Sequence, residues 1–355
     1  MPRLRDLGFI PGNLPTGAYN AITDVPGVLV GQVTLMAGEG RLQPGSGPVR
    51  TGVTAILPHD GDLFQEKVVA SAHTVNGFGK AVGFEQVREL GVIETPILLT
   101  NTLNVWRAAD GLVTSLLRQN PGIGITTSTV NPVVGECNDG FLNDIQGRHV
   151  KPEHIREAVE GAQGGVVAEG NVGAGTGTAC YQFKGGIGTA SRRALDFTVG
   201  ALVQTNFGQR RELRVLGAPV GRYLIDDMLP QPGPGSVMVV LAMDAPLDAR
   251  QLGRLARRAA LGLARTGTIS DNGSGDFVIA FSTSNRQLHD SQPVVETAMR
   301  FRETAINPLF VAVVESVEEA VYNALTAAEA MTGRDGNTLH ALPVDTLSRI
   351  LAQHL

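Results

Sequence analysis

A polar, glycine-rich loop runs directly into an apolar segment at residues 268–283, which read Thr268-Ile-Ser-Asp-Asn-Gly-Ser-Gly-Asp-Phe-Val-Ile-Ala-Phe-Ser-Thr283. The apolar half, Phe277 to Thr283, predicts a buried strand. Ser274 therefore lies at the start of a strand, between Gly273 and Gly275. Both glycines tolerate backbone conformations that other residues avoid, so the chain can bend sharply at this serine.

A sharp bend at Ser274 has a chemical consequence. If strain brings the Ser274 hydroxyl close to the Gly273 carbonyl carbon, an internal N→O acyl shift becomes possible. Hydrolysis of that ester would leave Ser274 as a new N-terminus, whose α-amine has an ordinary pKa of about 7.7–8.0 and can act as a general base. One residue would then supply both nucleophile and base. A simple turn is the alternative, and by composition alone it is the commoner explanation.

The segments just before this loop predict a strand followed by a helix. Val237 to Met243 is a continuous apolar run, which is typical of a buried strand. Asp244 can cap the helix that follows, with Pro246 in its first turn. Apolar residues then recur at helical spacing from Leu252 to Leu263, and arginines fall largely on the other side.

The rest of the chain also mixes strands and helices. Apolar residues alternate strictly from Phe197 to Val203, as in a half-buried strand. Residues 308–330 and 344–353 predict helices. This mixture predicts helices that cover a layered mixed sheet.

Composition restricts the classes of partner. Of 355 residues, 43% are hydrophobic and 18% charged, which allows a large buried core and argues against disorder. The net charge of −5 and the absence of a basic run argue against nucleic-acid binding. No run approaches the roughly 18 apolar residues of a membrane span, and no apolar stretch follows Arg3 and Arg5 as in a signal peptide. With only Cys137 and Cys180, the chain fits a reducing compartment, and we expect a cytoplasmic protein.

Several familiar site motifs are incomplete. The glycine-rich segment Gly170–Gly177 lacks the last glycine of a dinucleotide-binding fingerprint, and Gly77–Lys80 is followed by alanine where a phosphate loop needs Ser or Thr. No serine lies in a Gly-x-Ser-x-Gly elbow. His149 and His154 have no further donors at metal spacing, so no zinc site is predicted. A Ser–His–Asp triad stays open, with His73 its first candidate, because triad members need not be close in sequence.

Short motifs occur in order along nearly the whole chain. They are Arg5-Asp-Leu-Gly8, Asn20-Ala-Ile-Thr-Asp-Val-Pro-Gly27, Arg50-Thr-Gly-Val-Thr54, Val133-Val-Gly-Glu-Cys-Asn-Asp-Gly140, Glu169-Gly-Asn-Val-Gly-Ala-Gly-Thr-Gly177, Lys184-Gly-Gly-Ile-Gly-Thr189, Val203-Gln-Thr-Asn-Phe-Gly208, Asn272-Gly-Ser-Gly-Asp276, Phe281-Ser-Thr283 and Ser316-Val-Glu-Glu-Ala320. With this content and order the chain resembles the L-aminopeptidase/D-esterase family of self-processing hydrolases, which also contains the β-peptidyl aminopeptidases.

The resemblance implies a self-cleaving enzyme. Ser274 would be the nucleophile, freed by cleavage after Gly273. The products would be an α-chain of residues 1–273 and a β-chain of residues 274–355, which remain one structural unit spanning residues 1–355. The implied fold is a four-layer αββα sandwich, similar to that of the self-processing aminopeptidases and the ornithine acetyltransferases.

The resemblance also implies roles for other side chains. Asn206 matches the family's amide donor to the oxyanion. Ser316 and Glu318 match a serine and a carboxylate that hydrogen-bond around the nucleophile. Glu136 matches an acidic residue that binds the free amine of the substrate, and an ionised carboxylate there would explain cleavage at chain ends.

Three features complicate these roles. Ser316 and Glu318 are two residues apart, about 200° around a regular helix, so both can face Ser274 only if the helix breaks. Ser316 with a glutamate three residues later also fits a capping box, and Glu318 alone would be a solvated charge on a helix face. Some family members have a tyrosine hydroxyl near Glu136, where this chain has Asn138 and Phe141.

We therefore expect a self-processing N-terminal-serine aminopeptidase or amidase. It would hydrolyse small peptides, amides or esters with a free amino terminus through an acyl-enzyme on Ser274, with no metal or organic cofactor. By analogy with the family, processed protomers would form a homotetramer. The alternatives are an acyltransferase similar to the ornithine acetyltransferases, and an unprocessed, catalytically silent protein of the same fold.

Overall fold

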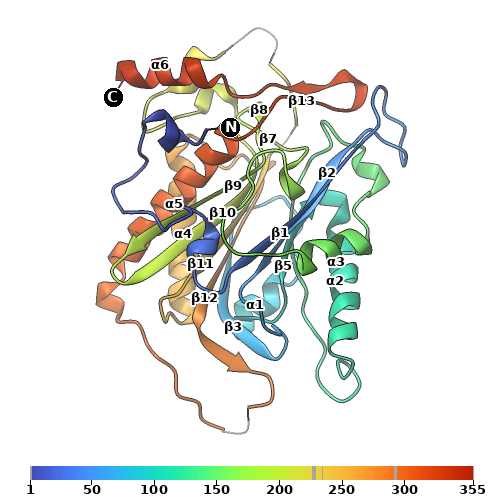
Figure 1. The fold of residues 1–355 in the computed structure, drawn as a ribbon, viewed down its shortest axis with the longest axis vertical. Coiled ribbons are helices and arrows are strands. Elements are labelled where there is room, and N and C mark those ends of the chain that lie inside the picture. The colour runs from blue at the N-terminus through green and yellow to red at the C-terminus, as the bar shows by residue number, and fades with distance from the viewer. Residues whose placement is uncertain (1, 226–228, 234, 292–293, 355) are drawn as a thin grey trace.

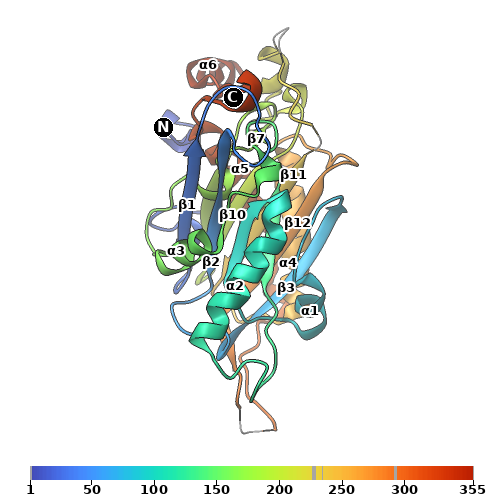
Figure 2. The same cartoon turned by 90° about the vertical axis from the view of Figure 1, so that its right-hand side faces the viewer.

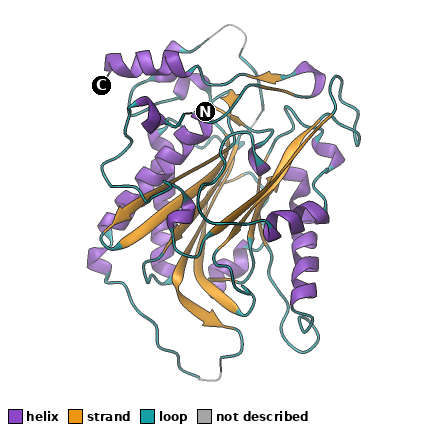
Figure 3. Cartoon of the chain, in the orientation of Figure 1, coloured by secondary structure: helices purple, strands orange, loops and turns teal. Residues whose placement is uncertain are grey.

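Two β-sheets pack face to face between helices in the computed structural model, which describes residues 2–225, 229–233, 235–291 and 294–354 (Figure 1). Helices α4 and α5 cover the larger sheet, and α2 and α3 cover the smaller one. The view turned by 90° and the colouring by secondary structure show the same layering, with strands inside and helices outside (Figures 2 and 3). The expected αββα sandwich is confirmed.

The larger sheet has the strand order β4-β3-β12-β11-β10-β9, and the smaller sheet has the order β1-β2-β5-β6. The strands are β1 (Leu29–Ala37), β2 (Val49–Leu57), β3 (Glu66–Gly77), β4 (Val92–Ile93), β5 (Ile97–Asn101), β6 (Val133–Cys137), β9 (Ile187–Ala194), β10 (Phe197–Asn206), β11 (Ser236–Met243) and β12 (Gly275–Leu288), with the short pairs β7 (Ala179–Cys180) and β8 (Phe183–Lys184), and β13 (Met331–Thr332) and β14 (Thr338–Leu339). The helices are α1 (Phe84–Leu90), α2 (Val105–Gln119), α3 (Pro152–Glu160), α4 (Ala249–Arg265), α5 (Asn307–Thr326) and α6 (Val344–His354). Within the described ranges, no helix combines the length and apolarity needed to cross a membrane.

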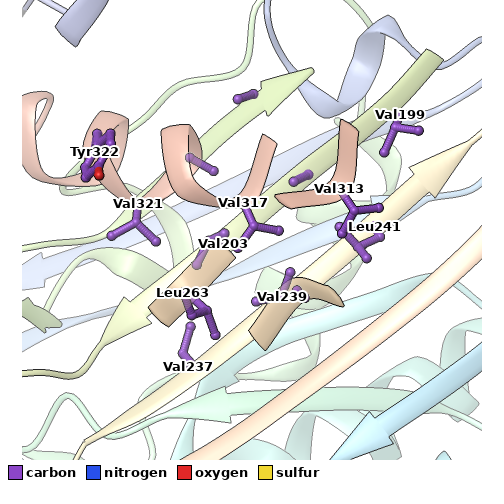
Figure 4. Packing of buried hydrophobic residues seen from close by; sticks show 14 of the residues in the cluster. Val199, Val203, Val237, Val239, Leu241, Leu263, Val313, Val317, Val321 and Tyr322 are labelled. Carbon is purple, nitrogen blue, oxygen red and sulfur yellow. The ribbon is translucent and has the colours of Figure 1, made fainter. Parts of the chain in front are cut away.

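Strand β11 is buried on both faces, which explains its continuous apolar sequence. Val237 and Val239 belong to the hydrophobic cluster beneath α4 and α5, and Figure 4 shows them on the same side as Val317 of α5. Met238 and Val240 belong to the second cluster, between the two sheets. Because successive side chains of a strand point to opposite faces, a strand in the middle of four layers needs an apolar residue at every position.

Helix α4 begins later than the sequence predicts. Its N-cap is Asp248, whose side chain accepts a hydrogen bond from the Gln251 N–H at 2.7 Å. The predicted cap, Asp244, instead accepts from the Thr198 N–H at 2.8 Å and ties the end of β11 to β10. Both residues can satisfy free backbone donors, and only the tertiary structure decides which donors lie within reach.

Helix α5 runs without a break and is anchored by a buried ion network. Arg192 of β9 is 0% exposed; its Nε lies 3.0 Å from Glu315, and its Nη2 lies 2.5 Å from Glu319. Arg5 near the N-terminus pairs with the same Glu319 at 2.6 Å. The capping box considered for Ser316 is wrong, because this serine lies inside the helix and Glu319 is an ion-pair partner.

Candidate active site

Strand ends of the larger sheet meet beside Ser274. Asn206 of β10 lies opposite Ser236 of β11, and Ser236 lies opposite Gly275 of β12. Gly275 in turn lies opposite Gly77 of β3. Ser274 immediately precedes Gly275 and is 2% exposed. The sheet thus places the predicted nucleophile and the predicted oxyanion donor at the same end, with β11 between their strands.

The peptide bond between Gly273 and Ser274 lies in a clamped turn. The Ser274 N–H donates to the carbonyl oxygen of Asp271 at 2.8 Å. The side-chain amide of Asn76 donates to the carbonyls of Asp271, at 3.0 Å, and Asn272, at 3.2 Å. It also donates to the Ser274 carbonyl. Asn76 therefore holds the turn on both sides of the predicted cleavage point, a role for which the sequence offered no signal.

Gly275 is needed for space and not for a left-handed backbone. A Cβ atom on Gly275 would lie 2.7 Å from the Cα of Gly79, so β12 can approach this neighbouring turn only with a glycine. The left-handed residue of the loop is Ser270, with φ of 54°. The loop thus bends four residues upstream of Ser274. The absence of side chains on Gly275 and Gly79 lets the start of β12 pack closely against the neighbouring turn.

Asp276 is the hydrogen-bond partner of the predicted nucleophile. The Ser274 hydroxyl donates to Asp276 Oδ1 at 2.5 Å, and both residues are 2% exposed. Burial raises the pKa of Asp276, hydrogen bonds from Ser274 and Ser270 lower it, and the charge of Asp271 raises it. This contact was not predicted from the sequence. The two-residue spacing was the available signal, because residues i and i+2 of a strand share a face.

A cavity of about 410 Å³ opens beside the turn, and both Gly273 and Asn206 line it. The Asn206 Oδ1 accepts a hydrogen bond from the Ala179 N–H at 3.0 Å. Its Nδ2 lies 3.5 Å from Ser236 Oγ, a long and weak contact. Since Oδ1 is held, the amide orientation is fixed, and the weakly engaged NH₂ group can donate to an atom in the cavity.

Glu136 lies near the start of β12. It is 3% exposed; its Oε1 accepts from the Lys80 N–H at 3.0 Å, and its Oε2 accepts from the Thr102 hydroxyl. Burial raises the pKa of Glu136, and the hydrogen bonds from Thr102 and Lys80 oppose this rise. A Cβ atom on Gly79 would be 3.3 Å from Glu136 Oε1 and 2.9 Å from the Cα of Gly275. One glycine therefore separates this carboxylate from the strand that begins at the nucleophile.

Ser316 and Glu318 are not brought to Ser274. The Ser316 hydroxyl donates to the Ala312 carbonyl at 2.6 Å, within its own helix. Glu318 accepts from the Tyr322 hydroxyl at 2.9 Å and from Arg265 Nη1 at 3.1 Å. Among the described residues, no hydrogen bond joins either side chain to Ser274. The expectation that they hydrogen-bond around the nucleophile is corrected, because α5 does not break and they are occupied elsewhere.

Lys184 fixes the backbone that holds Asn206. It is 0% exposed, and its Nζ donates to the carbonyls of Gly175 at 3.0 Å, Thr178 at 2.9 Å and the residue after Lys184 at 2.7 Å. Burial lowers the pKa of Lys184 to about 7. Ala179, which follows Thr178, supplies the N–H that orients Asn206. The glycine-rich segment is thus a packed support for the site.

We expect Lys184→Met to lower both stability and turnover. The substitution leaves buried carbonyls without a donor, at about 1–3 kcal/mol for each unsatisfied group. Thermal unfolding should shift down by several degrees, and kcat should fall more than KM rises, because Asn206 loses its support. The matched control is Lys67→Met, which removes a partly buried ion pair with Glu94 and should leave kcat/KM unchanged. Wild-type kcat in Lys184→Met would contradict the supporting role.

The histidines considered for a catalytic triad or a zinc site do not form either one in the described part of the chain. Burial and the charges of Arg257 and Arg88 lower the pKa of His73, and no hydrogen bond among the described residues joins it to a serine. His149 pairs with Asp144 at 3.0 Å. Across the described part of the chain, no group of three or more His, Cys, Asp or Glu side chains is arranged to hold a metal ion.

The positions where some relatives carry a tyrosine supply no hydroxyl. Asn138 is exposed, and its Oδ1 accepts from the Gly140 N–H at 2.9 Å. Phe141 packs beside Leu142 and Leu339 in a small apolar cluster. Neither residue can therefore replace the hydroxyl that some relatives have near Glu136.

Comparison with known proteins places this geometry in context. Residues 20–339 match the sequence model of peptidase family S58. The chain is 45% identical to a β-peptidyl aminopeptidase BapA of Sphingosinicella microcystinivorans, over 99% of this chain and 92% of that protein. The PH0078 protein of Pyrococcus horikoshii OT3 superimposes with a TM-score of 0.95 at 51% identity, over 99% of both chains. The L-aminopeptidase D-Ala-esterase/amidase of Ochrobactrum anthropi, described as a prototype for the serine aminopeptidases and a variant of the Ntn hydrolase fold, superimposes with a TM-score of 0.93 at 41% identity, over 100% of this chain and 99% of that chain.

Proposed function

Because this chain belongs to peptidase family S58 and is a serine aminopeptidase with a variant Ntn hydrolase fold, we propose that Ser274 is its nucleophile and that the chain cleaves itself after Gly273. The observation that carries this proposal is the cavity shared by Gly273 and Asn206. The bond predicted to break and the predicted oxyanion donor line the same space, and Glu136 lies one glycine away from the strand that Ser274 precedes.

The proposed reaction has two stages, acylation of Ser274 by the substrate and hydrolysis of the acyl-enzyme. After cleavage, the α-amine of Ser274 takes the hydroxyl proton as Oγ attacks the substrate carbonyl carbon. The Asn206 amide, with backbone N–H groups, stabilises the oxyanion, and the same amine returns the proton to the leaving amine. Water then releases the acyl group from Ser274. The carboxylate of Glu136 binds the ammonium of the substrate and restricts the reaction to free amino termini.

We propose that short peptides and amides with an N-terminal β-amino acid are among its substrates. The support is the 45% identity to a β-peptidyl aminopeptidase over 99% of this chain. A panel of p-nitroanilides that carry one L-α-, D-α- or β-residue tests this, together with the intact mass of the purified protein. Release from the β-residue substrate and masses for residues 1–273 and 274–355 are expected. One intact mass after long incubation would contradict self-cleavage, and transfer from an acetylated amino acid to an amine would indicate an acyltransferase.

We expect Glu136→Gln to weaken the preference for free amines. A hydrogen bond to a charged group contributes about 1.5–3 kcal/mol, so kcat/KM on free-amine substrates should fall roughly 10- to 100-fold. The rate on N-acetylated substrates should not change, so the ratio of the two rates shrinks. Glu94→Gln is the matched control, since Glu94 is 5% exposed and pairs with Lys67. An unchanged ratio in Glu136→Gln would refute the assignment.

We also propose that processed protomers assemble as a homotetramer and that the enzyme is cytoplasmic. The tetramer rests on analogy with the family, and light scattering after size-exclusion chromatography tests it. A mass of one or two protomers in solution would contradict it.

A further inference from the structure

Self-cleavage poses a problem that the mature mechanism does not solve. Before cleavage, the nitrogen of Ser274 belongs to a peptide bond, and an amide nitrogen has no basic lone pair. The α-amine that serves as base in the mature enzyme therefore does not yet exist. Another group must take the hydroxyl proton during the first step.

In the described part of the intact chain, the carboxylate of Asp276 lies at that proton. The Ser274 hydroxyl donates to Asp276 Oδ1 at 2.5 Å, which is a short, charge-assisted hydrogen bond. Gly275, which separates Ser274 from Asp276, is the first residue of β12 that pairs with β11, opposite Ser236. Ser274 and Asp276 therefore flank the first paired position of β12. Both side chains are 2% exposed, and water does not compete strongly for the contact.

The surroundings suit Asp276 to act as a base. Burial raises the pKa of Asp276, and the charge of Asp271 raises it further, against hydrogen bonds from Ser274 and Ser270 that lower it. A carboxylate with a raised pKa takes a proton more readily from a hydroxyl group. The Asn76 amide meanwhile donates to the carbonyls of Asp271, Asn272 and Ser274, and so holds the backbone on both sides of the Gly273–Ser274 peptide bond.

We propose that Asp276 is the general base that starts self-cleavage, taking the proton from the Ser274 hydroxyl while that residue's nitrogen is still part of a peptide bond. The inference rests on the proposed self-cleavage. Oγ forms a bond to the Gly273 carbonyl carbon as Asp276 gains the proton. The C–N bond then breaks, the nitrogen takes the proton back from Asp276, and an ester with a free α-amine results. Water cleaves the ester, which leaves the Gly273 carboxylate and the Ser274 hydroxyl.

The test follows cleavage of the full-length chain in time. Wild type, Asp276→Asn and Asp276→Glu are made by cell-free translation, quenched in denaturant and analysed by intact mass. Loss of a general base should slow Asp276→Asn by about 10²–10⁴-fold, and Asp276→Glu should recover part of the rate. Asp244→Asn is the matched control, since Asp244 accepts from the Thr198 N–H at the far end of β11 and should cleave normally.

Hydroxylamine separates the two steps, because it attacks the ester but not the peptide bond. It should accelerate wild-type cleavage and have little effect on Asp276→Asn, since formation of the ester is the slow step in that variant. Cleavage of Asp276→Asn at the wild-type rate, or its rescue by hydroxylamine, would overturn the proposal. If the wild type also stays intact, self-cleavage itself fails and this inference with it, whereas a wild type that cleaves beside a folded, intact Asp276→Asn supports both.

The folding of Asp276→Asn is checked by comparing its melting temperature with that of Ser274→Ala. If the melting temperature of Asp276→Asn differs and the variant is therefore misfolded, the pH dependence of wild-type cleavage tests the proposal instead. The wild-type cleavage rate should rise with pH through one ionisation above the ordinary range of an aspartate and then level off, because only the ionised carboxylate accepts a proton. Among the described residues, the other titratable groups on this side are Asp271 of the loop, Cys137 and Glu136 of β6, and Lys80, whose charge acts on Glu136. Asp271→Asn, Cys137→Ala and Glu136→Gln should keep the rise. A rate independent of pH, or a rise lost in one of these three variants, would overturn the proposal.

Discussion

Ser274→Ala is expected to yield one intact chain of 355 residues without aminopeptidase activity. Under the proposed mechanism the variant lacks the hydroxyl that would attack Gly273, so neither the N-terminal serine nor its α-amine would form. Removal of a serine nucleophile costs on the order of 10⁶ in kcat in a well-studied serine protease. Activity should therefore fall to the background of the assay, and intact mass should show the uncleaved chain.

The control for this variant is Ser284→Ala, which removes a hydroxyl from the same strand, β12, at a half-buried position. It should be cleaved and active. A Ser274→Ala chain that still separates into residues 1–273 and 274–355 would exclude Ser274 as the attacking group. Residual activity in an uncleaved chain would exclude the N-terminal amine as the base.

Asn206→Ala is expected to lower kcat by about 10²–10³-fold with little change in KM, the loss seen when one oxyanion donor is removed. The reason is geometric. Oδ1 of Asn206 is held by the Ala179 N–H at 3.0 Å, so the opposite NH₂ group has a fixed direction and is paired only weakly with Ser236, at 3.5 Å. Such a donor needs no reorganisation when negative charge develops on the substrate oxygen.

Asn206→Asp distinguishes a donor from a structural residue. Aspartate can still accept from the Ala179 N–H but cannot donate to an oxyanion, so it should lose at least as much kcat as alanine does. If Asn206→Asp retains wild-type turnover, the NH₂ group has no role in catalysis. Substrate binding measured in uncleaved Ser274→Ala with and without Asn206→Ala should differ little.

Local pattern was sufficient for some elements and not for others. The apolar run of Val237 to Met243 predicted a buried strand correctly, because both faces of this strand are covered and every one of these seven positions is buried. The helix cap was misplaced from Asp248 to Asp244, since both can accept from a backbone N–H. Ser274 and Asp276 are two residues apart, a spacing that allows their side chains to meet. The spacing alone does not show that these two side chains form a hydrogen bond.

For Ser316 and Glu318, the resemblance to the family predicted positions that the structure does not show. Resemblance placed both at the nucleophile, although a regular helix turns them about 200° apart. The helix is regular from Asn307 to Thr326, and the two side chains bond to Ala312 and to Arg265 and Tyr322. Helical geometry was the better guide here than the resemblance.

Sequence alone determined the layered α/β class, the position of a serine at the head of a buried strand, and the family, because these depend on residue types within short windows and on the order of motifs. Only the tertiary structure decided which residues surround that serine. Asn76, Glu136 and Asn206 come from segments that lie roughly 70 to 200 residues before Ser274, and the sheet register brings Asn76 and Asn206 to it. Strand pairing across such distances follows from how whole layers pack against one another, and no local pattern records it.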